Sequence, residues 1–146
     1  MRVYLDMCSI QRPLDTKNQP RIAVEAEAIL GILTLCEAGT VELVLSDALV
    51  FEMARNPHPV RKEYTVKVLA KATVVIPTDS QIEERARSLH AEGIKAVDAL
   101  HLASAVAAKA DYFCTCDDRL LKRAKALDLE ETKAVSPLEL IGEITL

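Results

Sequence analysis

Residues 2–6 read RVYLD, a short apolar run that ends on a carboxylate, Asp6. The run predicts a buried strand, and the acid at its end needs compensation, because burying an unpaired carboxylate costs several kcal/mol. Three more acids stand beside apolar sequence in a similar way, namely Glu52, Asp98 and Asp117. Four such acids predict one shared cation site.

Segments with strand and helix patterns alternate along the chain. The predicted strands are residues 2–6, 41–45, 73–76 and 112–115, and the predicted helices are residues 22–37, 47–55, 60–71, 96–109 and 118–127, with two capped helices beginning near Ser80 and Ser136. Ser80 and Glu83 form a predicted capping box. The alternating order predicts an α/β fold with a mainly parallel sheet covered by helices. Ligand sites of such sheets lie outside the carboxyl ends of the strands, where Asp6 and Asp117 fall.

Length and composition indicate one domain that spans residues 1–146. Half of the residues are apolar but only 3% are aromatic, so the core must consist mainly of Ala, Leu, Val and Ile. The net charge of −4 does not favour general attraction to nucleic acid or to an anionic membrane. No apolar segment approaches the ~20 residues that cross a bilayer. The four cysteines form no CxxC pair, so we expect a cytoplasmic protein without a membrane segment.

The four acids suit magnesium chemistry. Mg²⁺ prefers oxygen ligands and is usually held by one or two carboxylates together with substrate phosphates. Two such ions stabilise both the attacking and the leaving oxygen in phosphodiester cleavage. Each acid also has a purely structural interpretation. Asp6 could accept backbone N–H bonds, Glu52 could be a solvated helix residue, Asp98 could complement a helix dipole, and either Asp117 or Asp118 could cap the next helix.

Basic residues follow Asp117 directly. Arg119, Lys122 and Arg123 share one face of the predicted helix 118–127. They form either a solvated helix face or a counter-charge for substrate phosphates beside the predicted cation site.

Histidine and cysteine residues near these acids also have two interpretations. His101 lies three residues after Asp98, so it could orient a carboxylate, contact substrate, or simply pack in the core. Cys114 and Cys116 share one face of a predicted strand. Without a second ligand pair, we predict buried thiols there and not a zinc site.

Four sequence motifs, in order, resemble those of the PIN-domain nucleases, and especially of their VapC-like toxin members. They are YLDMCSI (residues 4–10), SDALVFEMAR (46–55), DALHLASA (98–105) and TCDDRLL (115–121). The resemblance implies an α/β/α sandwich and a Mg²⁺- or Mn²⁺-dependent ribonuclease. It also implies a homodimer that is inhibited by a small antitoxin.

Carried onto this sequence, the resemblance implies that Asp6, Glu52, Asp98 and Asp117 are the catalytic and metal-binding acids. Ser9, Ser104 and Thr115 are then supporting hydroxyls. The chain departs from the family at Met7 and Cys8, where Thr and then Asn or Ser are common. Either Ser9 substitutes for the lost hydroxyl, or the support around Asp6 is weaker than in the family.

We therefore predict a metal-dependent endoribonuclease that acts as the toxin of a toxin–antitoxin pair. The alternative is a catalytically weak or inactive module of the same fold that binds RNA or a protein partner. Aspartyl-phosphate chemistry is a minor alternative, because it requires a second acid at the position of Cys8.

Overall fold

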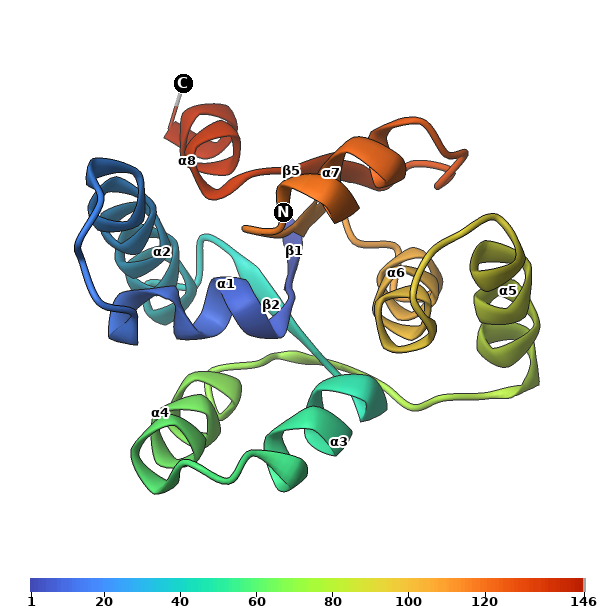
Figure 1. Cartoon of the computed structure of the whole chain (residues 1–146), viewed down its shortest axis with the longest axis horizontal. Coiled ribbons are helices and arrows are strands. Elements are labelled where there is room, and N and C mark those ends of the chain that lie inside the picture. Colours follow the sequence, from blue (N-terminus) through green and yellow to red (C-terminus); the bar gives the residue numbers. More distant parts are fainter. Residues whose placement is uncertain (146) are drawn as a thin grey trace.

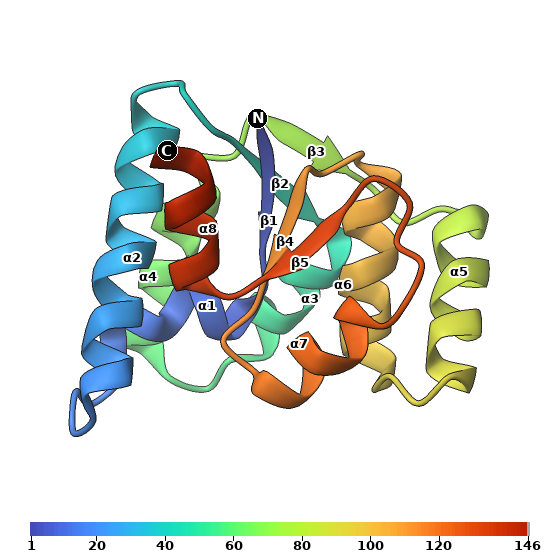
Figure 2. The ribbon, with the colours of Figure 1, turned by 90° about the horizontal axis from the view of Figure 1, so that it is seen from above.

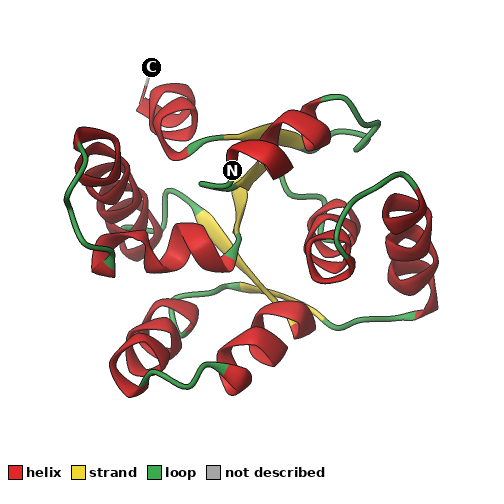
Figure 3. Ribbon diagram, in the orientation of Figure 1, coloured by secondary structure: helices red, strands yellow, loops and turns green. Residues whose placement is uncertain are grey.

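A computed structural model of the chain describes residues 1–145. Its centre is a five-stranded sheet with the order β3-β2-β1-β4-β5 (Figures 1 and 3). The strands are β1 (Arg2–Leu5), β2 (Glu42–Ser46), β3 (Val74–Ile76), β4 (Tyr112–Cys114) and β5 (Lys133–Val135). Every pairing is parallel, with Val3 of β1 opposite Leu43 on one side and Tyr112 on the other. The mainly parallel sheet that the sequence predicts is thus confirmed and is wholly parallel in the described residues.

Helices cover both faces of the sheet. They are α1 (Met7–Gln11), α2 (Pro20–Glu37), α3 (Asp47–Arg55), α4 (Pro59–Leu69), α5 (Ser80–Ala91), α6 (Ala96–Ala107), α7 (Asp118–Lys125) and α8 (Pro137–Thr145), with a 3₁₀ turn at Arg12–Leu14. Helices α2 and α8 lie on one side of the sheet, whereas α6 lies on the other with α5 outside it (Figure 1). This layering confirms the α/β/α sandwich. No helix within residues 1–145 is both long and apolar enough to span a membrane.

The core is aliphatic, as the composition predicts. Its two large aromatic members are Tyr4 and Phe113 on neighbouring central strands, with no exposed area, and their rings stack with centroids 5.6 Å apart. The remaining buried apolar residues are almost all Ala, Val, Leu, Ile and Cys. β1 lies at the centre of the sheet, so Asp6 follows its most enclosed strand.

Parallel pairing brings the carboxyl ends of the strands to one edge of the sheet. Helices α1, α3 and α7 begin at that edge, below the sheet in Figure 2. A side chain caps the start of each one: Asp6 for α1, Ser46 for α3 and Asp117 for α7. The edge therefore gathers three helix N-termini together with two of the four candidate acids.

The sequence prediction missed one strand, one helix and the 3₁₀ turn at Arg12–Leu14, and one cap was wrong. β5 is a three-residue edge strand whose short span carries no apolar alternation. Helix α1 is a five-residue turn, too short for helical periodicity. The capping box at Ser80 is wrong, because Asp79 accepts the N–H of Ile82 at 2.9 Å and Ser80 is already helical.

The predicted cap of the last helix is confirmed. Glu139 accepts the N–H of Ser136 at 3.0 Å, and the Ser136 hydroxyl accepts the N–H of Glu139 at 3.2 Å. The reciprocal pair is a capping box.

Candidate functional site

Asp6 is buried at the junction of β1 and α1, with 5% of its surface exposed. Its Oδ1 accepts the N–H of Ser9 at 3.1 Å, and its own N–H donates to the carbonyl of Cys114 at 3.1 Å. The Ser9 hydroxyl donates to the same carbonyl at 3.1 Å. Asp6 is therefore fixed between its own helix and β4, and Ser9 makes the supporting contacts.

The charge of Asp6 is only partly compensated. Burial raises the pKa of Asp6 from its ordinary value, while hydrogen bonds from Thr115 and Cys8, and the nearby His101, act in the opposite direction. The Cys8 thiol donates to Asp6 Oδ1 at 3.1 Å, so the residue that departs from the family pattern still contacts the carboxylate. Because the net pKa shift is upward, ionised Asp6 is less stable here than in water.

Asp98 links the four acids electrostatically. It lies in the first turn of α6 and is half-buried. Burial raises the pKa of Asp98, and the negative charges of Asp6, Asp117 and Glu52 raise it further against the opposing effect of His101. The fold thus brings acids from four separate sequence motifs within electrostatic range of one another.

Asp117 is exposed and caps α7. Its Oδ1 accepts the N–H groups of Arg119 at 3.0 Å and Leu120 at 3.2 Å, and its own N–H donates to the Thr115 hydroxyl at 3.1 Å. Of the two adjacent acids, Asp117 is therefore the cap. Thr115 contacts both Asp6 and Asp117, which connects the two strand ends.

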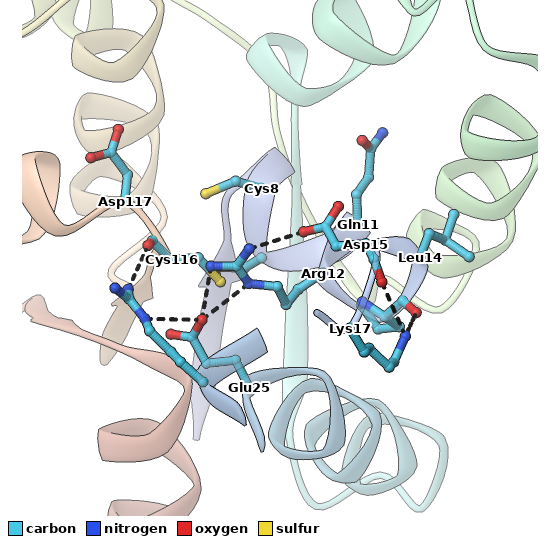
Figure 4. Close-up of polar contacts among 12 residues, drawn as sticks. Cys8, Gln11, Arg12, Leu14, Asp15, Lys17, Glu25, Cys116 and Asp117 are labelled. Carbon is cyan, nitrogen blue, oxygen red and sulfur yellow. Dashed lines mark hydrogen bonds and ion pairs between the residues drawn. The ribbon is translucent and has the colours of Figure 1, made fainter. Parts of the chain in front are cut away.

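An ion-pair cluster around the buried Glu25, which the sequence reasoning missed, holds the segment around Asp117. Glu25 of α2 is 2% exposed and pairs with Arg12 at 2.8 Å and with Arg21 at 3.4 Å. Arg21 also donates to the Cys116 carbonyl at 3.1 Å and pairs with Asp118 at 2.6 Å. In Figure 4 the Arg12 side chain extends between the carboxylates of Glu25 and Asp15. The one available sequence signal was an acid on the apolar face of a helix, at Glu25.

Glu52 projects from α3 and is partly exposed. Its Oε1 is hydrogen-bonded to Nε2 of His101, a residue with only 1% of its surface exposed. On the other side of the imidazole, Nδ1 lies 2.5 Å from the Tyr4 hydroxyl. His101 is therefore both a core residue and a partner of a candidate acid.

The remaining predicted hydroxyl lies apart from these contacts. Ser104 is fully buried in α6, and its Oγ has no hydrogen-bond partner within residues 1–145. Unlike Ser9 and Thr115, Ser104 makes no polar contact with the acids in the described part of the chain. The two predicted thiols, Cys114 and Cys116, are buried as expected.

A groove of about 230 Å³ opens between α6 and α7 beside the acids. Asp98 and Asp117 line it together with Lys95, Arg119 and Arg123. The sequence prediction of a basic face contained Arg119 and Arg123 but missed Lys95, which precedes α6. Lys122 from that prediction does not line the groove.

The donor set of the site suits a hard divalent cation, because it consists of carboxylates whose charge is only partly compensated. Within the described residues, no group of three or more His, Cys, Asp or Glu side chains is arranged to hold a metal ion. Glu52 directs one oxygen to His101, and Asp117 directs one to the amides of α7. The site fits a cation held by one or two carboxylates, with water and phosphate as its other ligands.

Comparison with known proteins agrees with this fold. The PIN domain family matches residues 3–127, and the chain belongs to that family. No curated protein matches the sequence. Among solved structures, the chain is similar to one in VapBC2 from Rickettsia felis bound to a DNA fragment from its promoter, with a TM-score of 0.61 and 14% identity over 93% of this chain and 98% of that one.

Replacing Asp6 by Asn should stabilise the metal-free protein at about pH 8. The folded-state pKa of Asp6 is raised, so its stabilising contribution exists at acid pH and is lost as the pH rises through that pKa. Asn keeps the capping oxygen without the charge. Each kcal/mol gained should raise the melting temperature by about 2–4 °C, measured by calorimetry in chelator.

The matched control is Asp79→Asn, which changes the same chemical group at the cap of a remote helix. The gain from Asp6→Asn should be smaller at about pH 4 than at about pH 8, because a carboxyl with a raised pKa takes up its proton more readily as the pH falls. If Asp6→Asn instead lowers the melting temperature equally at both pH values, the charge of Asp6 does not destabilise the metal-free protein, and the account of this residue is wrong.

Proposed function

We propose that the protein is a metal-dependent endoribonuclease whose acidic site consists of Asp6, Glu52, Asp98 and Asp117, with one or two of these carboxylates in contact with each cation. The observation that carries the proposal is the gathering of the acids at one place: Asp98 and Asp117 line the same groove, and burial together with the charges of Asp6, Asp117 and Glu52 raises the pKa of Asp98. Acids gathered at a cost in free energy need a cation to offset their repulsion. Membership of the PIN domain family supports the same conclusion, since PIN domains are in general nucleases.

The ion would be Mg²⁺ or Mn²⁺, and it supplies Lewis-acid activation of water and charge neutralisation at the phosphate. The protein's own residues would hold the ion and orient the RNA. Asp6 is rigid because it caps α1 and bonds to β4, and Asp117 is rigid because it caps α7. Lys95, Arg119 and Arg123 line the adjacent groove and offer positive charge to the RNA backbone.

A toxin role in a toxin–antitoxin pair is part of the proposal. The motifs resemble VapC-like toxins, and the similar structure comes from VapBC2. We propose a small antitoxin protein as partner and a homodimer as the assembly. The second candidate function is an inactive module that binds RNA or protein. Two observations favour this candidate. No group of three metal ligands is preformed within residues 1–145, and the chain departs from the family pattern at Met7 and Cys8.

Cleavage of structured RNA should require Mn²⁺ or Mg²⁺ and should stop when chelator is added. Asp98→Asn should reduce the cleavage rate by about 100-fold or more, because it weakens the binding of the cation that neutralises charge on the phosphate in the transition state. Mn²⁺ at 100 times its dissociation constant should stabilise the wild type by about 2.7 kcal/mol, and Asp98→Asn should lose much of that gain. Gel assays and calorimetry measure these quantities.

Glu131→Gln is the control, since it removes an exposed acid elsewhere. Cleavage that survives chelator, or equal Mn²⁺ stabilisation in wild type and Asp98→Asn, would contradict the metal site. RNA binding without cleavage under every condition would favour the inactive module.

Replacing Lys95, Arg119 and Arg123 together by Gln should weaken RNA binding and flatten its salt dependence. The slope of log affinity against log salt should fall by about 0.7 for each phosphate of single-stranded RNA that the variant no longer neutralises. The control replaces Lys67, Arg87 and Lys133, which removes the same charge from other surfaces. Filter binding over a salt series provides the measurement, and equal slopes in the two triple variants would reject the groove as the RNA site.

A further inference from the structure

A buried chain of hydrogen bonds connects the centre of the sheet with Glu52. The Ser46 hydroxyl at the end of β2 lies 2.6 Å from the Tyr4 hydroxyl, which lies 2.5 Å from Nδ1 of His101. Nε2 of the same imidazole bonds to Glu52 Oε1. Tyr4, Ser46 and His101 are each at most 1% exposed, so Glu52 is the one member of the chain that reaches solvent.

We propose that Tyr4 and His101 are positioning residues that orient the Glu52 carboxylate for its cation. The inference rests on the proposed function, because it assumes that Glu52 is a ligand. It deepens that function by stating which residues outside the acidic set control the site.

Satisfying every donor assigns a direction to each proton in the chain. The Ser46 oxygen accepts the N–H of Leu49 at 3.2 Å, so its single proton is free for the Tyr4 oxygen. The phenol, which is neutral at physiological pH, then donates to Nδ1 of His101. With Nδ1 as acceptor, the neutral imidazole carries its proton on Nε2, which donates to Glu52.

The opposite direction leaves donors and acceptors mismatched. If Nδ1 carried the proton, it would donate to Tyr4, and the lone pair of Nε2 would face the Glu52 carboxylate. The Ser46 proton would then lose its acceptor, because Tyr4 would donate to Ser46. Of the two neutral imidazole tautomers, the contacts therefore favour the one with its proton on Nε2, which donates to the Glu52 carboxylate.

Aromatic packing and helix capping fix the geometry of the chain. The Tyr4 ring stacks on Phe113 and meets the His101 ring edge-on, each with centroids 5.6 Å apart. The Ser46 hydroxyl that begins the chain is also the cap of α3, the helix that carries Glu52. The Ser46 hydroxyl thus positions both the start of the helix that carries Glu52 and, through Tyr4 and His101, the Glu52 carboxylate.

The bond to His101 determines which carboxylate oxygen is available. Because the imidazole engages Oε1, Oε2 is the oxygen that Glu52 can offer to a cation. A free Glu side chain would sample several rotamers before it could bind. Hydrogen-bonding partners of metal-binding side chains typically change metal affinity by 10–100-fold.

The first test reads the tautomer directly in metal-free protein. Long-range ¹H–¹⁵N NMR at about pH 8 distinguishes the two neutral forms of an imidazole. The protein has only three histidines, so their signals can be assigned individually. His101 should be protonated on Nε2 in the wild type. His90 is an internal contrast, because its Nδ1 lies 2.8 Å from the Ile94 carbonyl and should carry the proton. Tyr4→Phe should allow a second tautomer of His101, whereas a His101 protonated on Nδ1 in the wild type would overturn the inference.

The second test measures Mn²⁺ affinity by electron paramagnetic resonance of free Mn²⁺. His101→Leu should raise the dissociation constant by about 10–100-fold, and Tyr4→Phe should raise it less. His101→Gln, whose amide can still donate to Glu52, should restore affinity towards the wild-type value. Tyr112→Phe is the control, because it removes a hydroxyl that bonds to Glu143, far from the acids. Circular dichroism verifies that each variant is folded.

Glu52→Gln separates this inference from the proposed function. If Glu52→Gln binds Mn²⁺ more weakly but His101→Leu and Tyr4→Phe bind it as the wild type does, the positioning role is overturned and the metal site is retained. Unchanged Mn²⁺ affinity in Glu52→Gln, with weaker binding in Asp98→Asn, would overturn Glu52 as a ligand and the inference with it. Unchanged affinity in all of the acid variants would reject the proposed metal site itself.

Discussion

Repulsion among carboxylates at one edge of a parallel sheet is the constraint on which this structure depends. Parallel pairing of β1 and β4 brings Asp6 and Asp117 to the same edge, and α6 adds Asp98. Burial raises the pKa of Asp6, and burial together with the negative charges of Asp6, Asp117 and Glu52 raises the pKa of Asp98. The protein therefore contains a local electrostatic strain that a cation could relieve, and the proposed function follows from that relief.

The candidate acids are held by different interactions, and each of these interactions also stabilises the fold. Asp6 and Asp117 cap helices, so the groups that begin α1 and α7 are the groups that face the site. Glu52 is held by the imidazole of His101. The pair of Arg21 with Glu25 secures the segment that presents Asp117. Stability and chemistry thus depend on the same contacts, and damage to the fold is expected to weaken the site.

The sequence predicted four of the five strands, because strand–helix alternation is a local pattern. It also singled out four acids beside apolar runs, and the fold brings these acids within electrostatic range of one another. It could not predict β5 or α1, which are too short to show a period. Glu25 lies on an apolar helix face, and only its tertiary contacts with Arg12 and Arg21 explain it. The bond between His101 and Glu52 joins segments 49 residues apart, so sequence spacing left the role of His101 open.

The most direct test is a crystal structure grown with Mn²⁺ and measured at the manganese absorption edge. The account predicts an anomalous peak at the acids, in contact with Asp98 and at least one other of the four carboxylates, that disappears in Asp98→Asn. Crystals at saturating Mn²⁺ with no peak there, or with the peak elsewhere on the molecule, would contradict it.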